Sequence, residues 1–86
     1  MSAEKLSEQF QREARESAHH AALRLREAAA KLEQAFAGEP LAQDGREVVE
    51  AVGVGVWSAQ SCIANAVHRS ALAVLHRERE RTEADR

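Results

Sequence analysis

The second half of the chain carries a long run of apolar residues. Between Val48 and Trp57 only Glu50 is charged, and apolar residues recur at short intervals as far as Leu75. A helix that is apolar on every side must be buried on every side or lie in a membrane. A chain of 86 residues offers only one other long helix to cover this one. The pattern therefore predicts a core that is completed by another chain.

The first segment, residues 4–37, contains neither Gly nor Pro and shows the seven-residue repeat of a coiled coil. Small and apolar residues recur at alternating steps of four and three, and Leu6, Phe10 and Phe36 extend the pattern. The sequence predicts one helix from about residue 4 to 37, whose contact seam is formed by Ala14, Ala18, Ala21, Leu25, Ala28, Leu32 and Ala35.

A short break separates this segment from the second helix. Gly38 stands where a C-terminal cap is expected, and Pro40 prevents the helix from continuing. Asp44 with Glu47 three residues later resembles a capping box. We therefore expect a loop over residues 38–44, a second helix over about 45–80 and a charged tail over 77–86 that frays. A short loop makes the helices antiparallel neighbours in a single domain, residues 1–86.

The second helix has a seam of its own and a stripe of small residues. The predicted seam is Val49, Val52, Val56, Ala59, Ile63, Ala66, Ser70 and Ala73. Ala51, Gly55 and Ala59 stand four residues apart and predict a shallow groove for a partner helix. We expect the partner-binding surface to consist of Val48, Val52, Gly55, Val56, Trp57, Ala59 and Ile63.

Composition and charge narrow the class of protein. The formal net charge of −2 gives no general attraction to nucleic acid or to anionic lipid. A single cysteine, Cys62, favours a reducing compartment and thus the cytoplasm, and the N-terminus lacks the pattern of a secretory signal. Membrane insertion is not expected, because polar and charged residues interrupt the apolar stretch: Glu50, Gln60, Asn65, His68 and Arg69.

Three residues are weak candidates for metal chemistry. Glu16 and His19 have the Glu-x-x-His spacing of di-iron bundles, but the facing part of the second helix, near residue 66, offers no carboxylate. Folding the hairpin brings Cys62 level with His19 and His20, whereas a structural zinc site needs four ligands. Helices packed through alanines also leave no substrate cleft. We therefore expect no metal, no cofactor and no enzymatic activity.

Nucleic acid is the other class of ligand to consider. Four arginines lie on the first helix, but Glu13, Glu16 and Glu27 stand between them: Arg12, Arg15, Arg24 and Arg26. Electrostatic binding of RNA requires clustered positive charge. The mixed signs indicate a solvated helix face, and nucleic-acid binding is not the favoured function.

The residues that resemble a known family lie in two segments and in the Gly-containing turn between the helices. The segments are residues 18–28 (AHHAALRLREA) and residues 70–76 (SALAVLH). With them the chain resembles the small helical-hairpin co-chaperones of type III secretion needle subunits. The resemblance implies a cytoplasmic protein without enzymatic activity. It further implies pairing with a tetratricopeptide-like chaperone, so that the two hold an aggregation-prone needle subunit before export.

The expected fold is all-α: an antiparallel, coiled-coil-like two-helix hairpin that completes a helical bundle with another chain. The expected function is protein–protein interaction, as a small chaperone or assembly subunit in a hetero-oligomer. The alternative is a homodimeric four-helix bundle that binds RNA or acts as a regulator, and a metal-binding bundle is the minor alternative.

Overall fold

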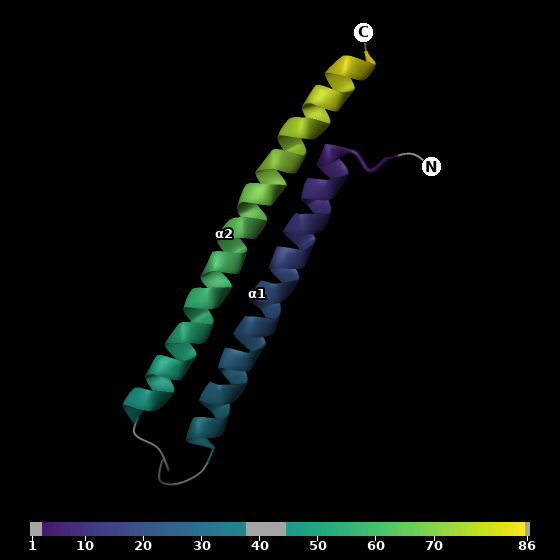
Figure 1. The fold of residues 1–86 in the computed structure, drawn as a ribbon. Helices are drawn as coiled ribbons and strands as arrows, with labels where there is room; N and C mark the ends of the chain where they lie inside the picture. The colour runs from purple at the N-terminus through teal and green to yellow at the C-terminus, as the bar shows by residue number, and fades with distance from the viewer. Residues whose placement is uncertain (1–2, 38–44, 86) are drawn as a thin grey trace.

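The computed structural model describes residues 3–37 and 45–85, and within them the chain forms two helices (Figure 1). Helix α1 comprises Leu6–Phe36 and helix α2 comprises Gly45–Ala84. The helices run antiparallel and side by side, which confirms the all-α hairpin (Figure 1). The molecule measures 69 × 22 × 13 Å, so it is a single layer of helices with two broad faces.

The ends of the helices differ slightly from the prediction. Helix α1 begins at Leu6, where the backbone N–H of Lys5 donates a hydrogen bond to Glu8 Oε2 at 3.4 Å. Helix α2 continues beyond residue 80 to Ala84. Its last turns consist of Arg and Glu, which are good helix formers, and Ser7 holds Glu80 against α1. The predicted cap at Gly38, the break at Pro40 and the cap at Asp44 lie outside the described residues.

The contact seam of α1 is rotated by one position from the predicted one. Four of the seven predicted seam residues are correct, because Ala14, Ala21, Ala28 and Ala35 are buried or half-buried. The other three are wrong, because Ala18, Leu25 and Leu32 are exposed. Phe10 and Ser17, three positions after the preceding seam residue, are half-buried in their place, and Ser7 is buried at the start of the helix. Arg24 occupies the same column with its side chain exposed and its backbone carbonyl near Gly55.

Helix α2 shows the same shift. The predicted residues Val52, Ala59, Ala66 and Ala73 do face α1, whereas the alternating predicted positions 49, 56, 63 and 70 are exposed. The observed seam repeats at steps of four and three along the whole helix: Val48, Val52, Gly55, Ala59, Cys62, Ala66, Arg69, Ala73, His76 and Glu80.

Small residues explain the choice of seam. A Cβ built on Gly55 would lie 3.5 Å from the Ala28 Cβ and 4.0 Å from the Arg24 carbonyl oxygen, so the backbones approach closely there. Ala59 is 0% exposed, and Ala21, Ala28 and Ala73 are also buried along the seam. Close approach of two helices requires small side chains at the contact, and leucines at these positions would push the helices apart. In the described residues no large side chain is fully buried, so the core of the hairpin is thin.

Polar and aromatic contacts set the register of the two helices. Ser7 Oγ donates a hydrogen bond to Glu80 Oε2 at 2.6 Å, and the Ser7 N–H donates to Glu80 Oε1 at 3.2 Å. The Phe10 and His76 rings stack with their centroids 5.3 Å apart. Farther along, Asn65 Nδ2 donates to Ser17 Oγ at 2.8 Å. Asn65 is thus a polar residue of α2 that fixes the register within the hairpin.

Candidate interaction surface

Apolar side chains on α1 form a second stripe beside the seam. From residue 18 onward they stand one position after the seam column, at steps of four and three, and most are exposed: Ala18, Ala22, Leu25, Ala29, Leu32 and Phe36. Earlier in the helix the same column holds Glu8, Gln11 and Arg15. No charged residue interrupts this stripe. Leu25, Leu32 and Phe36 therefore present their side chains outside the hairpin, where α2 does not cover them.

Helix α2 carries an equivalent stripe, again one position after each seam residue. Its members are uncharged and mostly apolar: Val49, Gly53, Val56, Gln60, Ile63, Val67, Ser70 and Val74. All of them are exposed to solvent. Nothing lies within 4 Å of a Cβ built on Gly53, which marks an open position in the stripe.

The two stripes lie on the same broad face of the hairpin. On each helix the stripe is rotated from the seam by one residue in the direction of the C-terminus. Because the two helices are antiparallel and their seams face each other, this rotation brings both stripes to the same side of the hairpin. A groove of about 480 Å³ between the helices supports this placement, because residues of both stripes line it, among them Ala18, Val67 and Ser70. We call the two stripes together the apolar face.

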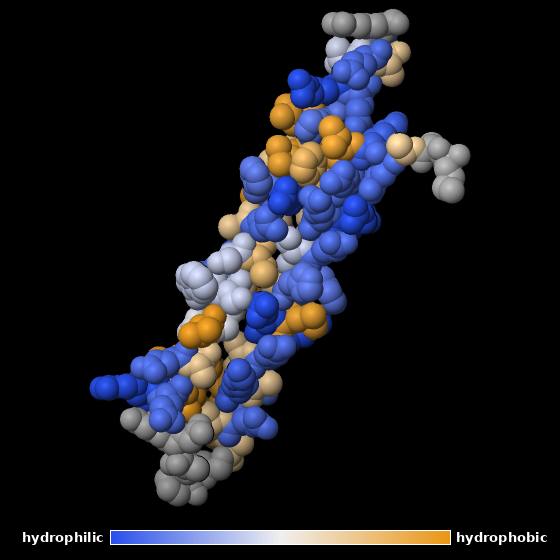
Figure 2. Space-filling view, in the orientation of Figure 1, coloured by the Kyte–Doolittle hydropathy of each residue, from blue (hydrophilic) through white to orange (hydrophobic). Residues whose placement is uncertain are grey.

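The opposite face is more polar, and we call it the polar face. It carries the residues one position before each seam residue, among them Glu13, Glu27 and His68, together with separate exposed apolar side chains such as Leu23 and Val54. In Figures 1 and 2, α1 lies on the right with its N-terminal end at the top. In a right-handed helix seen from this side, the residues one position before the seam point toward the reader, so Figure 2 shows the polar face. Hydrophilic side chains (blue) predominate there, and apolar ones (orange) stand in separate groups (Figure 2). The hairpin therefore has one apolar and one polar face.

The structure divides the predicted partner-binding residues into two sets. Val48, Gly55 and Ala59 are covered by α1, and Val52 is half-buried beside them. In the predicted groove for a foreign helix, Gly55 and Ala59 are thus covered by the chain's own first helix, and Ala51 is exposed. The other three predicted residues are exposed: Val56, Trp57 and Ile63.

Trp57 stands at the edge of the apolar face. Its side chain is 70% exposed, on the side of α2 that points away from α1. Val56 and Ile63 belong to the α2 stripe itself. The α1 stripe was not among the predicted partner-binding residues, although its pattern is present in the sequence. Residues 18, 22, 25, 29, 32 and 36 repeat at steps of four and three, and this column lies directly beside the seam column.

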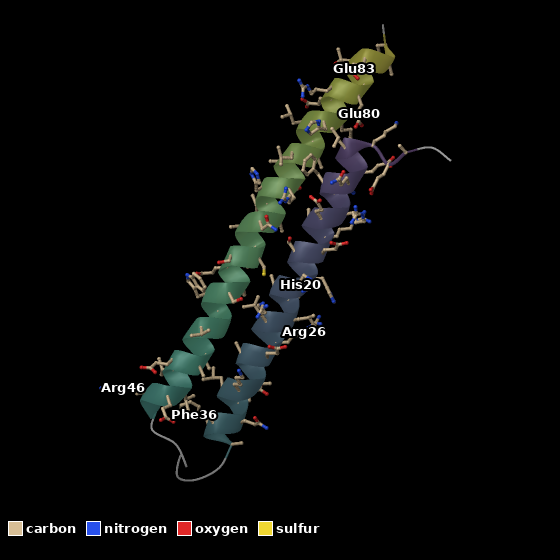
Figure 3. All side chains as sticks on the ribbon, in the orientation of Figure 1. His20, Arg26, Phe36, Arg46, Glu80 and Glu83 are labelled. Carbon is tan, nitrogen blue, oxygen red and sulfur yellow. The ribbon has the colours of Figure 1, made fainter. Side chains whose placement is uncertain are left out.

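The metal candidates do not assemble. Glu16 is bound to Arg12, its Oε1 lying 3.3 Å from Arg12 Nη1, and His19 and His20 are exposed (Figure 3 labels His20). Cys62 is half-buried in the seam. In the described part of the chain, no three His, Cys, Asp or Glu side chains form a group that could hold a metal ion.

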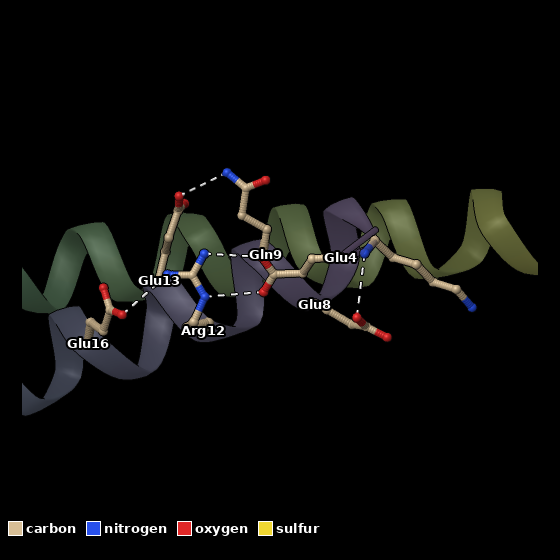
Figure 4. Close-up of polar contacts among 7 residues, drawn as sticks. Glu4, Glu8, Gln9, Arg12, Glu13 and Glu16 are labelled. Atoms are coloured by element: carbon tan, nitrogen blue, oxygen red, sulfur yellow. Dashed lines mark hydrogen bonds and ion pairs between the residues drawn. The ribbon is translucent and has the colours of Figure 1, made fainter. Parts of the chain in front are cut away.

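Arg12 is the centre of a small ion-pair network (Figure 4). Its Nε lies 3.1 Å from Glu4 Oε1, and Glu16 binds it from the other side. Hydrogen bonding to Arg12 holds the pKa of the Glu4 carboxyl below its usual range, and Glu4 in turn raises the pKa of the arginine. This arginine is therefore neutralised by its neighbours, which weakens the case for a basic nucleic-acid surface.

Comparisons with known proteins give no assignment: no family model, no curated protein and no solved structure matches the chain. Within the described residues neither helix has a stretch long and apolar enough to span a membrane.

Proposed function

We propose that the protein is a non-enzymatic interaction module whose apolar face packs against the helices of a second chain. The observation that carries the proposal is the pair of uncharged stripes on one face, opposite a polar face. Contiguous exposed apolar surface of this kind marks sites of association. Both helices contribute to the surface, so the docking element is the whole hairpin face.

The thin core gives the second chain a stabilising role. The hairpin buries alanines and leaves Leu25, Leu32, Phe36 and Ile63 partly open to water. Covering a partly exposed Leu or Ile side chain contributes on the order of 1 kcal/mol. A bundle completed by two further helices would bury all of these side chains, so association and folding stability should rise together.

The resemblance to type III secretion co-chaperones is compatible with this role. A co-chaperone of that kind would use the apolar face to hold a different helical protein. The lone Cys62 fits action in the reducing cytoplasm. Under this reading the partner is the second chaperone or the exported subunit.

Matched substitutions on the two faces test the proposal. Leu25 on the apolar face and Leu23 on the polar face are 43% and 39% exposed. Val67 and Val54 are a second pair, 65% and 67% exposed. We expect Leu25→Glu and Val67→Glu to abolish association in light scattering coupled to size-exclusion chromatography. Leu23→Glu and Val54→Glu should leave it unchanged. Equal effects within each pair would contradict a dedicated apolar face.

A further inference from the structure

We propose that the apolar face is covered by a second copy of this chain, related by a two-fold axis parallel to the helices. The four helices then form an antiparallel bundle in which the Phe36 and Arg46 ends of both copies (labelled in Figure 3) lie at the same end. This inference rests on the proposed function, since it names the occupant of that same face.

The register of the hairpin sets which residues would meet. Residues in contact across the hairpin have numbers that add up to between 79 and 88, as for Phe10 with Arg69 and Gln11 with Arg77. A two-fold axis parallel to the helices leaves every residue at its own height. Each residue of the α1 stripe therefore faces the α2 stripe of the partner copy at the same height. The pairs, each adding up to 85, are Ala18–Val67, Ala22–Ile63, Leu25–Gln60, Ala29–Val56, Leu32–Gly53 and Phe36–Val49.

In four of the six pairs a large side chain meets a small one, whereas Leu25–Gln60 and Phe36–Val49 each pair two larger side chains. Ala18, Ala22 and Ala29 on α1 would each meet a β-branched residue, which a small neighbour can accommodate. The large Leu32 would meet Gly53, where nothing fills the space within 4 Å. Large against small at successive layers is the arrangement that packs helices at native density. The face is therefore complementary to itself, which favours a second copy as its occupant.

The contact area between two whole hairpins is sufficient for a stable dimer. Helix α1 has 31 residues and is therefore about 46 Å long at about 1.5 Å per residue. Two helices side by side are about 20 Å wide, so each copy covers about 900 Å², and the apolar stripe of α1, residues 18–36, takes up about 28 Å of that length. Stable dimers cover about 800 Å² per partner.

The area also selects the orientation. A two-fold axis across the helices would place large residues against small ones as well, for instance Leu32 against Ala22. That arrangement superimposes only the apolar stretch from 18 to 36, about 28 Å long, and covers about 560 Å² per partner. It falls short of the usual dimer interface. The axis parallel to the helices is therefore preferred.

Mass and one intermolecular distance test the arrangement. Light scattering over a concentration series should give twice the 9.5 kDa mass of the chain. A spin label at Arg79→Cys, in a Cys62→Ala background, then reports orientation by pulsed electron resonance. With the axis parallel to the helices, the two labels lie level with each other and below about 35 Å apart, given helix diameters of about 10 Å. With the axis across the helices they lie about 60 Å apart, at about 1.5 Å per residue, and that result would overturn the orientation.

Gly53 tests the contact itself. Gly53→Leu would place a side chain where Leu32 of the partner copy packs, and should weaken the dimer about tenfold or more. Gly53→Ala should leave it nearly unchanged. Circular dichroism checks that both variants remain helical, as expected from the open space around Gly53. A dimer that is insensitive to Gly53→Leu would overturn the proposed pairing.

Failure of this inference can be told apart from failure of the proposed function. A monomer that binds a hydrophobic dye, and loses the dye with Leu25→Glu but not with Leu23→Glu, would refute the second copy and keep the interaction face. A different helical protein, as the co-chaperone resemblance implies, would then be its occupant. A monomer whose dye binding ignores both variants, or a dimer that ignores Leu25→Glu and Val67→Glu, would refute both.

Discussion

Gly55 offers a direct measurement of how closely the two helices approach. The expected result of a substitution series there changes sign with side-chain size. Gly55→Ala adds a Cβ at 3.5 Å from the Ala28 Cβ, an ordinary contact, and removes the cost of glycine in a helix. It should stabilise the protein by about 0.5–1 kcal/mol. Gly55→Leu keeps that gain but drives the larger side chain into Ala28 and the Arg24 carbonyl. Overpacking costs about 1–3 kcal/mol, so Gly55→Leu should be less stable than Gly55→Ala by about 1–3 kcal/mol.

Thermal unfolding followed by circular dichroism at a fixed protein concentration measures this series. For a chain of this size each kcal/mol shifts the melting temperature by about 4–8 °C. Gly55→Ala should therefore melt above the wild type and Gly55→Leu clearly below Gly55→Ala. If Gly55→Leu melted at or above Gly55→Ala, the close approach at this position would be refuted, and the seam would have to run through another column of α2.

Further predictions concern the seam, the pH dependence and the surface. Ala59→Leu should destabilise the hairpin by about 1–3 kcal/mol because Ala59 is fully buried, whereas Ala64→Leu, at an exposed position, should be nearly neutral in the same melts. Hydrogen bonds from Ser7 hold the pKa of the Glu80 carboxyl below its ordinary value of 4.5. The stabilisation is therefore present above that pH and is lost on acidification, so the melting temperatures of Glu80→Gln and wild type should differ at pH 7 and converge as the pH falls below 4.5; a constant difference would contradict the linkage. Arg12→Ala should leave the midpoint of denaturant titrations nearly unchanged, since its ion pairs are exposed, and a clear decrease in the midpoint would indicate a structural role.

Two helices and their antiparallel arrangement could be predicted from local sequence. Residues 4–37 contain neither Gly nor Pro, and the break near Pro40 separates them from a second helical segment. Helix-forming residues and seven-residue periodicity act within a few turns of the chain, so both helices can be predicted without knowledge of the tertiary structure. The excess of apolar surface on the second helix could also be predicted from the local sequence, and Trp57 and Val56 are exposed in the structure.

The tertiary structure alone decided which column of each helix is the seam. On α1 the columns Ser17–Arg24 and Ala18–Leu25 flank the same alanines, and hydrophobicity favours the leucine column. In the structure the leucine column is not the seam, because the two helices approach so closely at Gly55 and Ala28 that a leucine side chain does not fit between them. Hydrophobicity ranks residues one by one, whereas the distance between two helices is a property of the pair. That distance turned Leu25, Leu32 and Phe36 outward and, with the valines of α2, made the apolar face.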